Sequence, residues 1–147
     1  MPTGSTAPDG GSDRLSRLPS WQRALECTRS ALDRKAYDLV VLDTAKLTSI
    51  ADYFVLCSGR SDTQVQAIAD AVREHLGSLG VRPLAVEGYE RGQWILLDFG
   101  DIVVHVFYVP VRAFYDLERL WARAPRVELP EPFHSQARSL KTGTEHA

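Results

Sequence analysis

Apolar residues recur at the spacing of an amphipathic helix in two stretches of the chain. The first covers residues 21–32 and follows Ser20, which the pattern predicts as the N-cap. The second covers residues 65–79 and follows Ser61 and Gln64, whose spacing matches a capping box. A glycine and then a proline come after this second stretch, as expected where a helix ends.

Short apolar runs between these stretches predict strands. The runs over residues 38–43 and 53–57 are continuous, which is typical of strands buried on both faces. Three further strands are predicted over residues 84–86, 93–98 and 102–109, followed by a helix from near Val111 to before Pro125. This order predicts an α/β (α+β) fold, with a mixed five-stranded sheet flanked by helices in one domain over residues 20–127.

The last two strands are predicted to form a hairpin closed by Gly100 and Asp101, a favoured two-residue loop. In that register Asp98 faces Val103, Leu96 faces His105 and Trp94 faces Phe107. These six side chains would then share one face of the sheet. A three-residue loop would instead place His105 opposite Ile95 and Leu97, and we prefer the shorter loop.

Both ends of the chain are polar and carry few apolar residues. Residues 1–19 predict a disordered N-terminal tail, and residues 128–147 predict a flexible C-terminal tail. No apolar run approaches the roughly 20 residues needed to span a bilayer, and no signal peptide is visible. We therefore expect no membrane contact and a cytoplasmic location, or an organelle of cytoplasmic descent.

The formal net charge is −2, and the chain has no Lys/Arg cluster. Proteins that mainly contact phosphate backbone are usually basic, so we expect little or no direct contact with RNA. Between Leu84 and Glu118 six acidic residues outnumber two arginines, which gives a net charge of −4. This segment would suit a basic partner, and it is about equally compatible with a merely soluble surface.

The reactive side chains predict no metal site, no cofactor and no catalytic set. Cys27 and Cys57 are too few for a structural metal site and are interpreted as free buried thiols. Asp98 and Asp101 could hold Mg²⁺, but no third carboxylate is expected beside them, and Asp101 can simply stabilise the turn. Residues 59–61 could bind an anion at a helix start, although a plain turn is favoured.

Two residues of the hairpin are candidates for either a structural or a functional role. Trp94 begins its strand beside a turn, and the residues alone favour a core anchor over an interface anchor. His105 lies in mid-strand among aliphatic residues. We interpret it as a core histidine bonded to a polar neighbour, with Asp98 across the hairpin as the candidate, rather than as a general base.

The helical period divides the last predicted helix into two faces. Tyr115 and Glu118 share one face, with Arg112 and Arg119 beside them. The other face is predicted to comprise Phe114, Leu117, Leu120 and Trp121. Tyr115 is therefore expected to be at least partly exposed, as suits an interface, although a solitary surface tyrosine is common.

A series of short motifs runs through the chain in a fixed order. The first half contains residues 38–43 (DLVVLD), 50–59 (IADYFVLCSG) and 61–70, with Gln64 and the run AIAD. The second half contains Glu87-Gly88, Gly92-Gln-Trp94, Leu97-Asp98, residues 100–107 (GDIVVHVF) and residues 112–121 (RAFYDLERLW). From about Trp21 to Val127 this string resembles the Iojap, or ribosomal silencing factor, family.

The resemblance implies a fold like that of nucleotidyltransferases but without catalysis. It also implies binding to the large ribosomal subunit through ribosomal protein fourteen, so that the small subunit cannot dock. Such a protein represses translation when nutrients are scarce. The family also permits a homodimer of the free protein.

Matched by position, the resemblance implies roles for individual side chains. Partner contacts are expected at Glu87, Trp94, Asp98, Arg112, Tyr115 and Glu118, where Arg112 and Glu118 also order their helix face. Structural support is expected from His105, Asp101 and Trp121. The resemblance thus shifts the interpretation of Trp94 from core residue to interface anchor.

Two rival functions remain as alternatives. A nucleotidyltransferase would bind nucleotide near residues 59–61, with Mg²⁺ on Asp98 or Asp101, but the third carboxylate is missing. An RNA-binding factor would lose affinity steeply with salt, and the charge distribution gives little support for it. Both rank below the ribosome-binding hypothesis.

Overall fold

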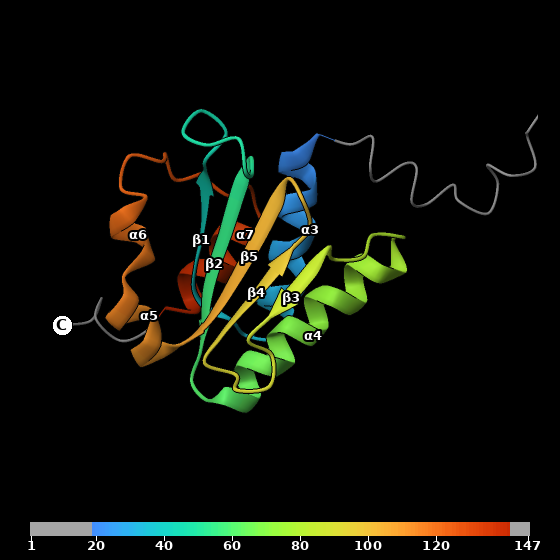
Figure 1. The fold of residues 1–147 in the computed structure, drawn as a ribbon, viewed down its shortest axis with the longest axis vertical. Helices are drawn as coiled ribbons and strands as arrows, with labels where there is room; N and C mark the ends of the chain where they lie inside the picture. The colour runs from blue at the N-terminus through green and yellow to red at the C-terminus, as the bar shows by residue number, and fades with distance from the viewer. Residues whose placement is uncertain (1–18, 142–147) are drawn as a thin grey trace, which may run out of the picture.

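Five strands form one mixed sheet in the order β1-β2-β5-β4-β3 (Figure 1). The computed structural model describes residues 19–141. The strands are β1 (Tyr37–Asp43), β2 (Tyr53–Gly59), β3 (Ala85–Glu87), β4 (Trp94–Asp98) and β5 (Ile102–Tyr108). Strands β2 and β5 run parallel, and every other neighbouring pair is antiparallel. The predicted α+β class with a mixed five-stranded sheet is confirmed.

The two faces of the sheet carry separate hydrophobic cores. One face packs against α3 (Ser20–Asp33), α4 (Asp62–Ser78) and α7 (Phe133–Ser139), which lie behind the sheet in Figure 1. The other packs against the short helices α5 (Val109–Tyr115) and α6 (Leu117–Leu120) and the residues that follow. In β2, Val55 belongs to the first core while Phe54 and Leu56 belong to the second. Burial on both faces explains why β1, β2 and β5 are almost continuously apolar.

The β4–β5 hairpin has the predicted register. Asp98 pairs with Val103, Leu96 with His105 and Trp94 with Phe107. The Phe99 N–H donates to the Ile102 carbonyl at 2.9 Å and closes the two-residue loop. This register places Trp94, Leu96 and Phe107 on the face covered by α5 and α6.

The predicted N-cap is confirmed for α4 and is wrong for α3. The Ser61 hydroxyl caps α4 by accepting from the Gln64 N–H at 3.0 Å, and Gln64 Oε1 accepts from the Arg60 N–H at 2.6 Å. Ser20, however, is the first residue of α3 and not its N-cap, which is Pro19. The Ser20 hydroxyl donates instead to Asp52 at 2.8 Å, so a tertiary partner replaces the predicted local one.

The single helix predicted near residues 111–124 is wrong. Helix α5 starts earlier, with Pro110 in its first turn, where the missing N–H costs nothing. It ends at Asp116, whose left-handed backbone (φ 49°) separates it from α6. The Asp116 N–H still donates to the Arg112 carbonyl at 2.8 Å as the last bond of α5, and the left-handed backbone of Asp116 then turns the chain.

The predicted C-terminal tail is wrong for its described part, residues 128–141. Helix α7 buries Phe133 and Ala137 in the core shared with α3 and α4. The same region covers the edge of β1, since Val41 accepts from the Val127 N–H at 2.8 Å and Leu140 accepts from the Asp38 N–H at 2.9 Å. Only a few widely spaced apolar residues make these contacts, which gave a weak sequence signal. The predicted N-terminal tail lies almost wholly outside the described residues.

Candidate functional site

Three aromatic residues form a partly exposed surface where β4 meets α5. Phe114 is 80% exposed and Tyr115 54% exposed, while Trp94 is half-buried beneath them. Ring centroids lie 5.0 Å apart for Phe114 and Tyr115 and 5.1 Å apart for Tyr115 and Trp94. We call Trp94, Phe114 and Tyr115 the aromatic surface. Two aromatic side chains this exposed are costly to leave in water and mark a surface suited to a partner.

The strand register and the preceding turn hold Trp94 in place. Its ring lies 4.9 Å from that of Phe107, its partner on β5, and its Nε1–H donates to His105 Nδ1 at 3.2 Å. Gly88 has a positive φ of 80°, and a Cβ atom there would collide with the Trp94 carbonyl oxygen. A cavity of about 240 Å³ opens beside the ring, lined by Gly88, Arg91, Gln93, Trp94, Val111 and Tyr115. Trp94 is thus both a core residue and part of an accessible hollow.

His105 supports Trp94 as a neutral side chain. Burial lowers its pKa from 6.5 to about 4. Because Nδ1 accepts from Trp94, the ring proton lies on Nε2, which has no hydrogen-bond partner in the described structure. The expected bond to Asp98 is wrong, because the Asp98 carboxylate accepts from the Gly100 N–H at 2.8 Å and serves the turn. His105 therefore contacts the tryptophan as a hydrogen-bond acceptor.

Arg112 fixes the corner between α5 and α6. It is 8% exposed, and its Nε and Nη2 donate to the two carboxylate oxygens of Glu118, both at 3.1 Å. Its Nη1 donates to the Asp38 carbonyl at 2.8 Å and to the Ser58 hydroxyl at 3.0 Å. A bidentate pair of this kind is directional as well as charged, so it ties both helices to β1 and β2.

The predicted division of the last helix into two faces is wrong. Phe114 and Leu120 are 80% and 78% exposed, although the period placed them with the buried residues. Arg112 is buried, although the period placed it on the face of Tyr115. The break at Asp116 is the reason, since a helical period cannot extend through a left-handed residue. Leu117 is buried, and the Trp121 ring lies edge-on to Phe54 at 4.9 Å.

The acidic residues near the hairpin have separate tasks. Asp101 forms an ion pair with Arg23 of α3, and its carbonyl accepts from the Asp52 and Tyr53 N–H groups. Asp98 serves the turn, and Glu87 is exposed at the end of β3. Within residues 19–141 no group of three or more His, Cys, Asp or Glu side chains could hold a metal ion.

The two cysteines are free and buried, as predicted. Burial raises the pKa of both the Cys27 and the Cys57 thiol to about 12. Thiols with so high a pKa carry almost no thiolate at neutral pH and are poor nucleophiles. They serve as small apolar core residues.

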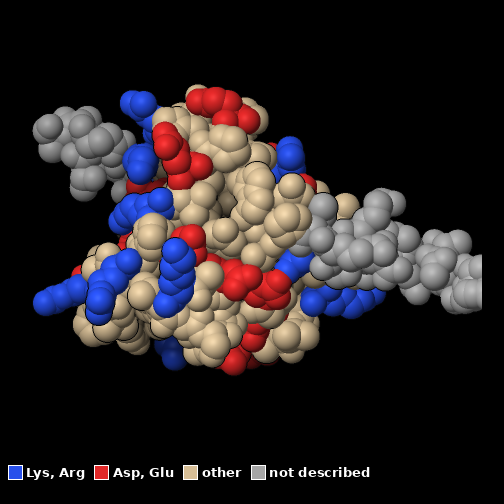
Figure 2. Space-filling model, turned by 90° about the horizontal axis from the view of Figure 1, so that it is seen from above, with Lys and Arg blue, Asp and Glu red and all other residues tan. Residues whose placement is uncertain are grey.

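Charge is unevenly distributed over the surface. Figure 2, which views the end of the molecule that is uppermost in Figure 1, shows acidic groups across the middle and Lys and Arg mainly on the side of α5 and α6. The exposed basic residues after the corner are Arg119, Arg123, Arg126, Arg138 and Lys141. The aromatic surface therefore lies within the net acidic stretch of residues 84–118, and a basic stretch of chain follows it.

Comparison with known proteins places this geometry in a family. A family model described as "Ribosomal silencing factor during starvation" matches residues 18–147. The chain belongs to the ribosomal silencing factor family. The match includes both the aromatic surface and α7.

Curated silencing factors from two bacteria resemble this family member closely. The ribosomal silencing factor of Halalkalibacterium halodurans is 44% identical over 109 residues, which cover 74% of this chain and 93% of the relative. The ribosomal silencing factor of Bacillus subtilis is 42% identical over 97 residues, which cover 66% of this chain and 82% of the relative. A chloroplastic Iojap protein of Arabidopsis thaliana is 35% identical over 79% of this chain, which spans about half (48%) of that longer protein.

Solved structures have the same fold as this silencing-factor family member. A crystal structure of a Chromobacterium violaceum protein has a TM-score of 0.70 at 34% identity and covers 80% of this chain and 99% of its own. A crystal structure of a protein from Bacillus halodurans has a TM-score of 0.65 at 41% identity, and it covers 74% of this chain and 99% of its own. The sheet and its helices are therefore a shared framework.

The structure brings only some of the predicted contact residues of this family member together. Trp94 and Tyr115 are adjacent, whereas Arg112 and Glu118 are occupied with each other and with the sheet. Phe114 and Leu120 are exposed apolar residues that sequence reasoning assigned to the core. The sequence signal that could have found them is Asp116, a residue type that tolerates the left-handed conformation better than most.

No helix among the described residues combines the length and the apolar character that crossing a bilayer requires.

Proposed function

We propose that this silencing-factor family member binds the large ribosomal subunit through ribosomal protein fourteen and prevents the small subunit from docking. The observation that carries the proposal is the aromatic surface, with Phe114 80% and Tyr115 54% exposed above a rigidly held Trp94. Aromatic residues are enriched among the side chains that dominate binding at protein interfaces. Membership of the ribosomal silencing factor family supplies the ribosome as the target.

Charge supports a protein partner of basic character. Residues 84–118 carry a net charge of −4, and Glu87, Glu90 and Asp116 within this segment are exposed. A basic surface would be attracted to them, which raises the association rate and fixes orientation more than it raises affinity. The aromatic residues would then supply most of the binding free energy.

The proposed mode of action is occupancy without catalysis. A bound protein of this size excludes another particle from the surface it covers, so no bond needs to be made or broken. Repression would follow whenever the protein is bound and would be relieved when it dissociates. On this proposal the protein works in the cytoplasm, or in an organelle, as the chloroplastic name of one relative allows.

Sedimentation of the full chain with separated ribosomal subunits tests this proposal. We expect the parent to comigrate with large subunits and to reduce the fraction of joined ribosomes. Phe114→Ala should weaken binding by about tenfold or more without loss of fold, and Trp94→Ala should cost about 2 kcal/mol or more of binding free energy. Trp21→Ala is the matched control, because Trp21 is 42% exposed on α3, behind the opposite face of the sheet, and should bind as the parent does.

A second measurement identifies the partner. Calorimetry with isolated ribosomal protein fourteen should give one-to-one binding to the parent and weak binding to Phe114→Ala. If the parent binds large subunits but not this protein, the proposed partner is wrong and silencing stands. If the parent leaves subunits free to join, steric silencing itself is wrong for this chain.

A further inference from the structure

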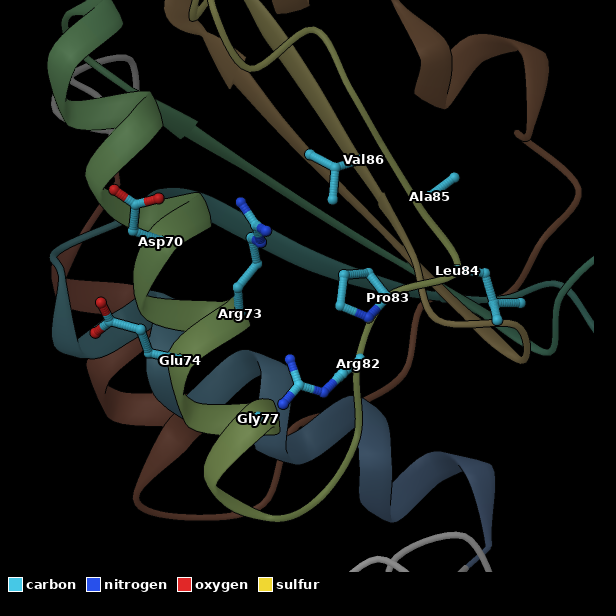
Figure 3. Close-up of a pocket in the computed structure, with 9 residues that line it drawn as sticks. All are labelled: Asp70, Arg73, Glu74, Gly77, Arg82, Pro83, Leu84, Ala85 and Val86. Atoms are coloured by element: carbon cyan, nitrogen blue, oxygen red, sulfur yellow. The ribbon is translucent and has the colours of Figure 1, made fainter.

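A cavity of about 650 Å³ lies between α4 and the strand β3, apart from the residues that form the aromatic surface. Figure 3 shows its two walls: the exposed side of α4, and the segment that runs from Arg82 through Pro83 to Val86. Its volume falls within the range of roughly 300–1,000 Å³ typical of small-molecule sites. Strand β3 is the last strand of the sheet, so no further strand fills this space.

Two arginines approach the cavity from different elements. Arg73 belongs to α4, and Arg82 belongs to the loop before β3. Figure 3 shows the Arg73 side chain reaching from the helix toward β3 and the Arg82 side chain turning back toward Gly77. Neither guanidinium makes a hydrogen bond or an ion pair within residues 19–141. The cavity therefore offers two sets of paired N–H donors that the described protein leaves unused.

The two acidic residues of the same wall form no ion pair with these arginines within residues 19–141. The Asp70 carboxylate accepts the Tyr89 hydroxyl at 3.0 Å, an interaction that raises the pKa of Tyr89. Glu74 also borders a separate cavity between α3 and α4, beside His75. In Figure 3 both carboxylates lie on the side of α4 away from β3. Asp70 and Glu74 belong to the lining of the cavity, but their carboxylates point away from the Arg73 and Arg82 guanidinium groups in Figure 3.

We propose that this cavity is a binding site for a small molecule that carries a phosphate or diphosphate group. Two guanidinium groups that each donate a pair of N–H bonds need about four acceptor oxygens, more than a single carboxylate provides. Pro83 and Val86 give the remaining wall an apolar surface for the uncharged part of the ligand. Nothing in this proposal depends on binding to the ribosome.

Calorimetry with the full chain and no ribosomes tests the proposal, with pyrophosphate and adenosine diphosphate as the probes. We expect saturable one-to-one binding, and tighter binding of adenosine diphosphate because its base and sugar can contact the apolar wall. Arg73→Gln and Arg82→Gln should each weaken binding by about tenfold or more, the worth of a hydrogen-bonded charge. The affinity of Arg73→Lys should lie between those of the parent and Arg73→Gln, since lysine keeps the charge but cannot donate two parallel N–H bonds. The exposed Arg123 lies outside the cavity, so Arg123→Gln is the matched control and should bind as the parent does.

Three results would overturn this assignment. The first is no saturable binding of either probe by the parent at millimolar concentration. The second is equal binding by the parent and by both glutamine variants, which would place the anion elsewhere. The third is succinate binding as tightly as pyrophosphate, which would remove the reason for choosing phosphate. Since these measurements contain no ribosomes, their failure would leave the silencing proposal untouched.

Discussion

At the scale of single residues, the contact between Trp94 and His105 links the core to the aromatic surface. The indole N–H donates to the imidazole, and the imidazole lies edge-on to Phe54 at 5.0 Å. A buried acceptor left without its donor would cost about 1–3 kcal/mol, so each side chain restrains the other. The tryptophan is thereby held in one orientation before any partner arrives, which lowers the entropy lost on binding.

The titration of His105 predicts how stability depends on pH. Its pKa is about 4 in the folded protein and 6.5 when unperturbed, so between these values the unfolded state binds more protons. The stability that comes from keeping His105 neutral is therefore complete above about pH 6.5 and is lost as the pH falls toward 4. We measure the free energy of unfolding by chemical denaturation at pH 7 and at pH 4.5. Between these two pH values it should fall by about 2 kcal/mol more in the parent than in His105→Gln. Equal losses in the two proteins would contradict this account.

At the scale of elements, the corner between α5 and α6 decides which side chains face outward. Both helices are too short to be stable alone, so their position depends on tertiary contacts. Arg112 provides these contacts by bonding Glu118 across the corner and by donating to β1 and β2. The exposure of Phe114 and Leu120 is a direct consequence of this arrangement.

Replacement of Arg112 should loosen the whole corner. In Arg112→Gln the Glu118 carboxylate loses its bidentate partner in a partly buried position, and we expect the free energy of unfolding to fall by about 3 kcal/mol. Arg126 also contacts Glu118, at 3.4 Å, but its side chain is 62% exposed. Urea denaturation of Arg126→Gln should therefore show a change of less than about 1 kcal/mol. If the two variants were equally stable, the corner would not depend on Arg112.

The hairpin and the corner differ in how far the sequence could predict them. The observed register of β4 and β5 is the preferred one of the two that the sequence allowed, because a two-residue glycine-containing loop is a favoured hairpin connection. The corner was not predicted, since an aspartate tolerates the left-handed region but nothing local forces Asp116 into it. Its conformation depends on Arg112 reaching Asp38 and Ser58, which lie 74 and 54 residues away along the chain.

At the scale of the whole molecule, the C-terminal segment completes the sheet and its larger core. Helix α7 lies against α3, and Arg29 lies 5.0 Å from the centre of the Phe133 ring. Residues 125–127 cover part of the edge of β1, which would otherwise be open to pairing with other chains. The folded unit therefore extends beyond residue 127, the predicted end of the domain.

Phe133→Ala measures how much α7 contributes. Phe133 is 6% exposed, and we expect its removal to lower the free energy of unfolding by about 3 kcal/mol. Phe114→Ala is the matched control, because Phe114 is 80% exposed and should change stability by less than about 0.5 kcal/mol. Thermal or urea denaturation of the two variants distinguishes them. Equal stabilities would show that the segment from Pro130 onward behaves as a tail after all.

The sequence by itself determined the strands, the two long helices, the hairpin register and the family. These features depend on local periodicity, on turn chemistry and on ordered motifs, all of which lie within short stretches of chain. Only the tertiary structure decided that α7 belongs to the fold, that Arg112 is buried and that Phe114 is exposed. Each of these outcomes depends on partners more than fifty residues away or on one unusual backbone angle. A periodic pattern carries no information about distant partners or about a single backbone angle. The aromatic surface could therefore be identified only from the folded structure.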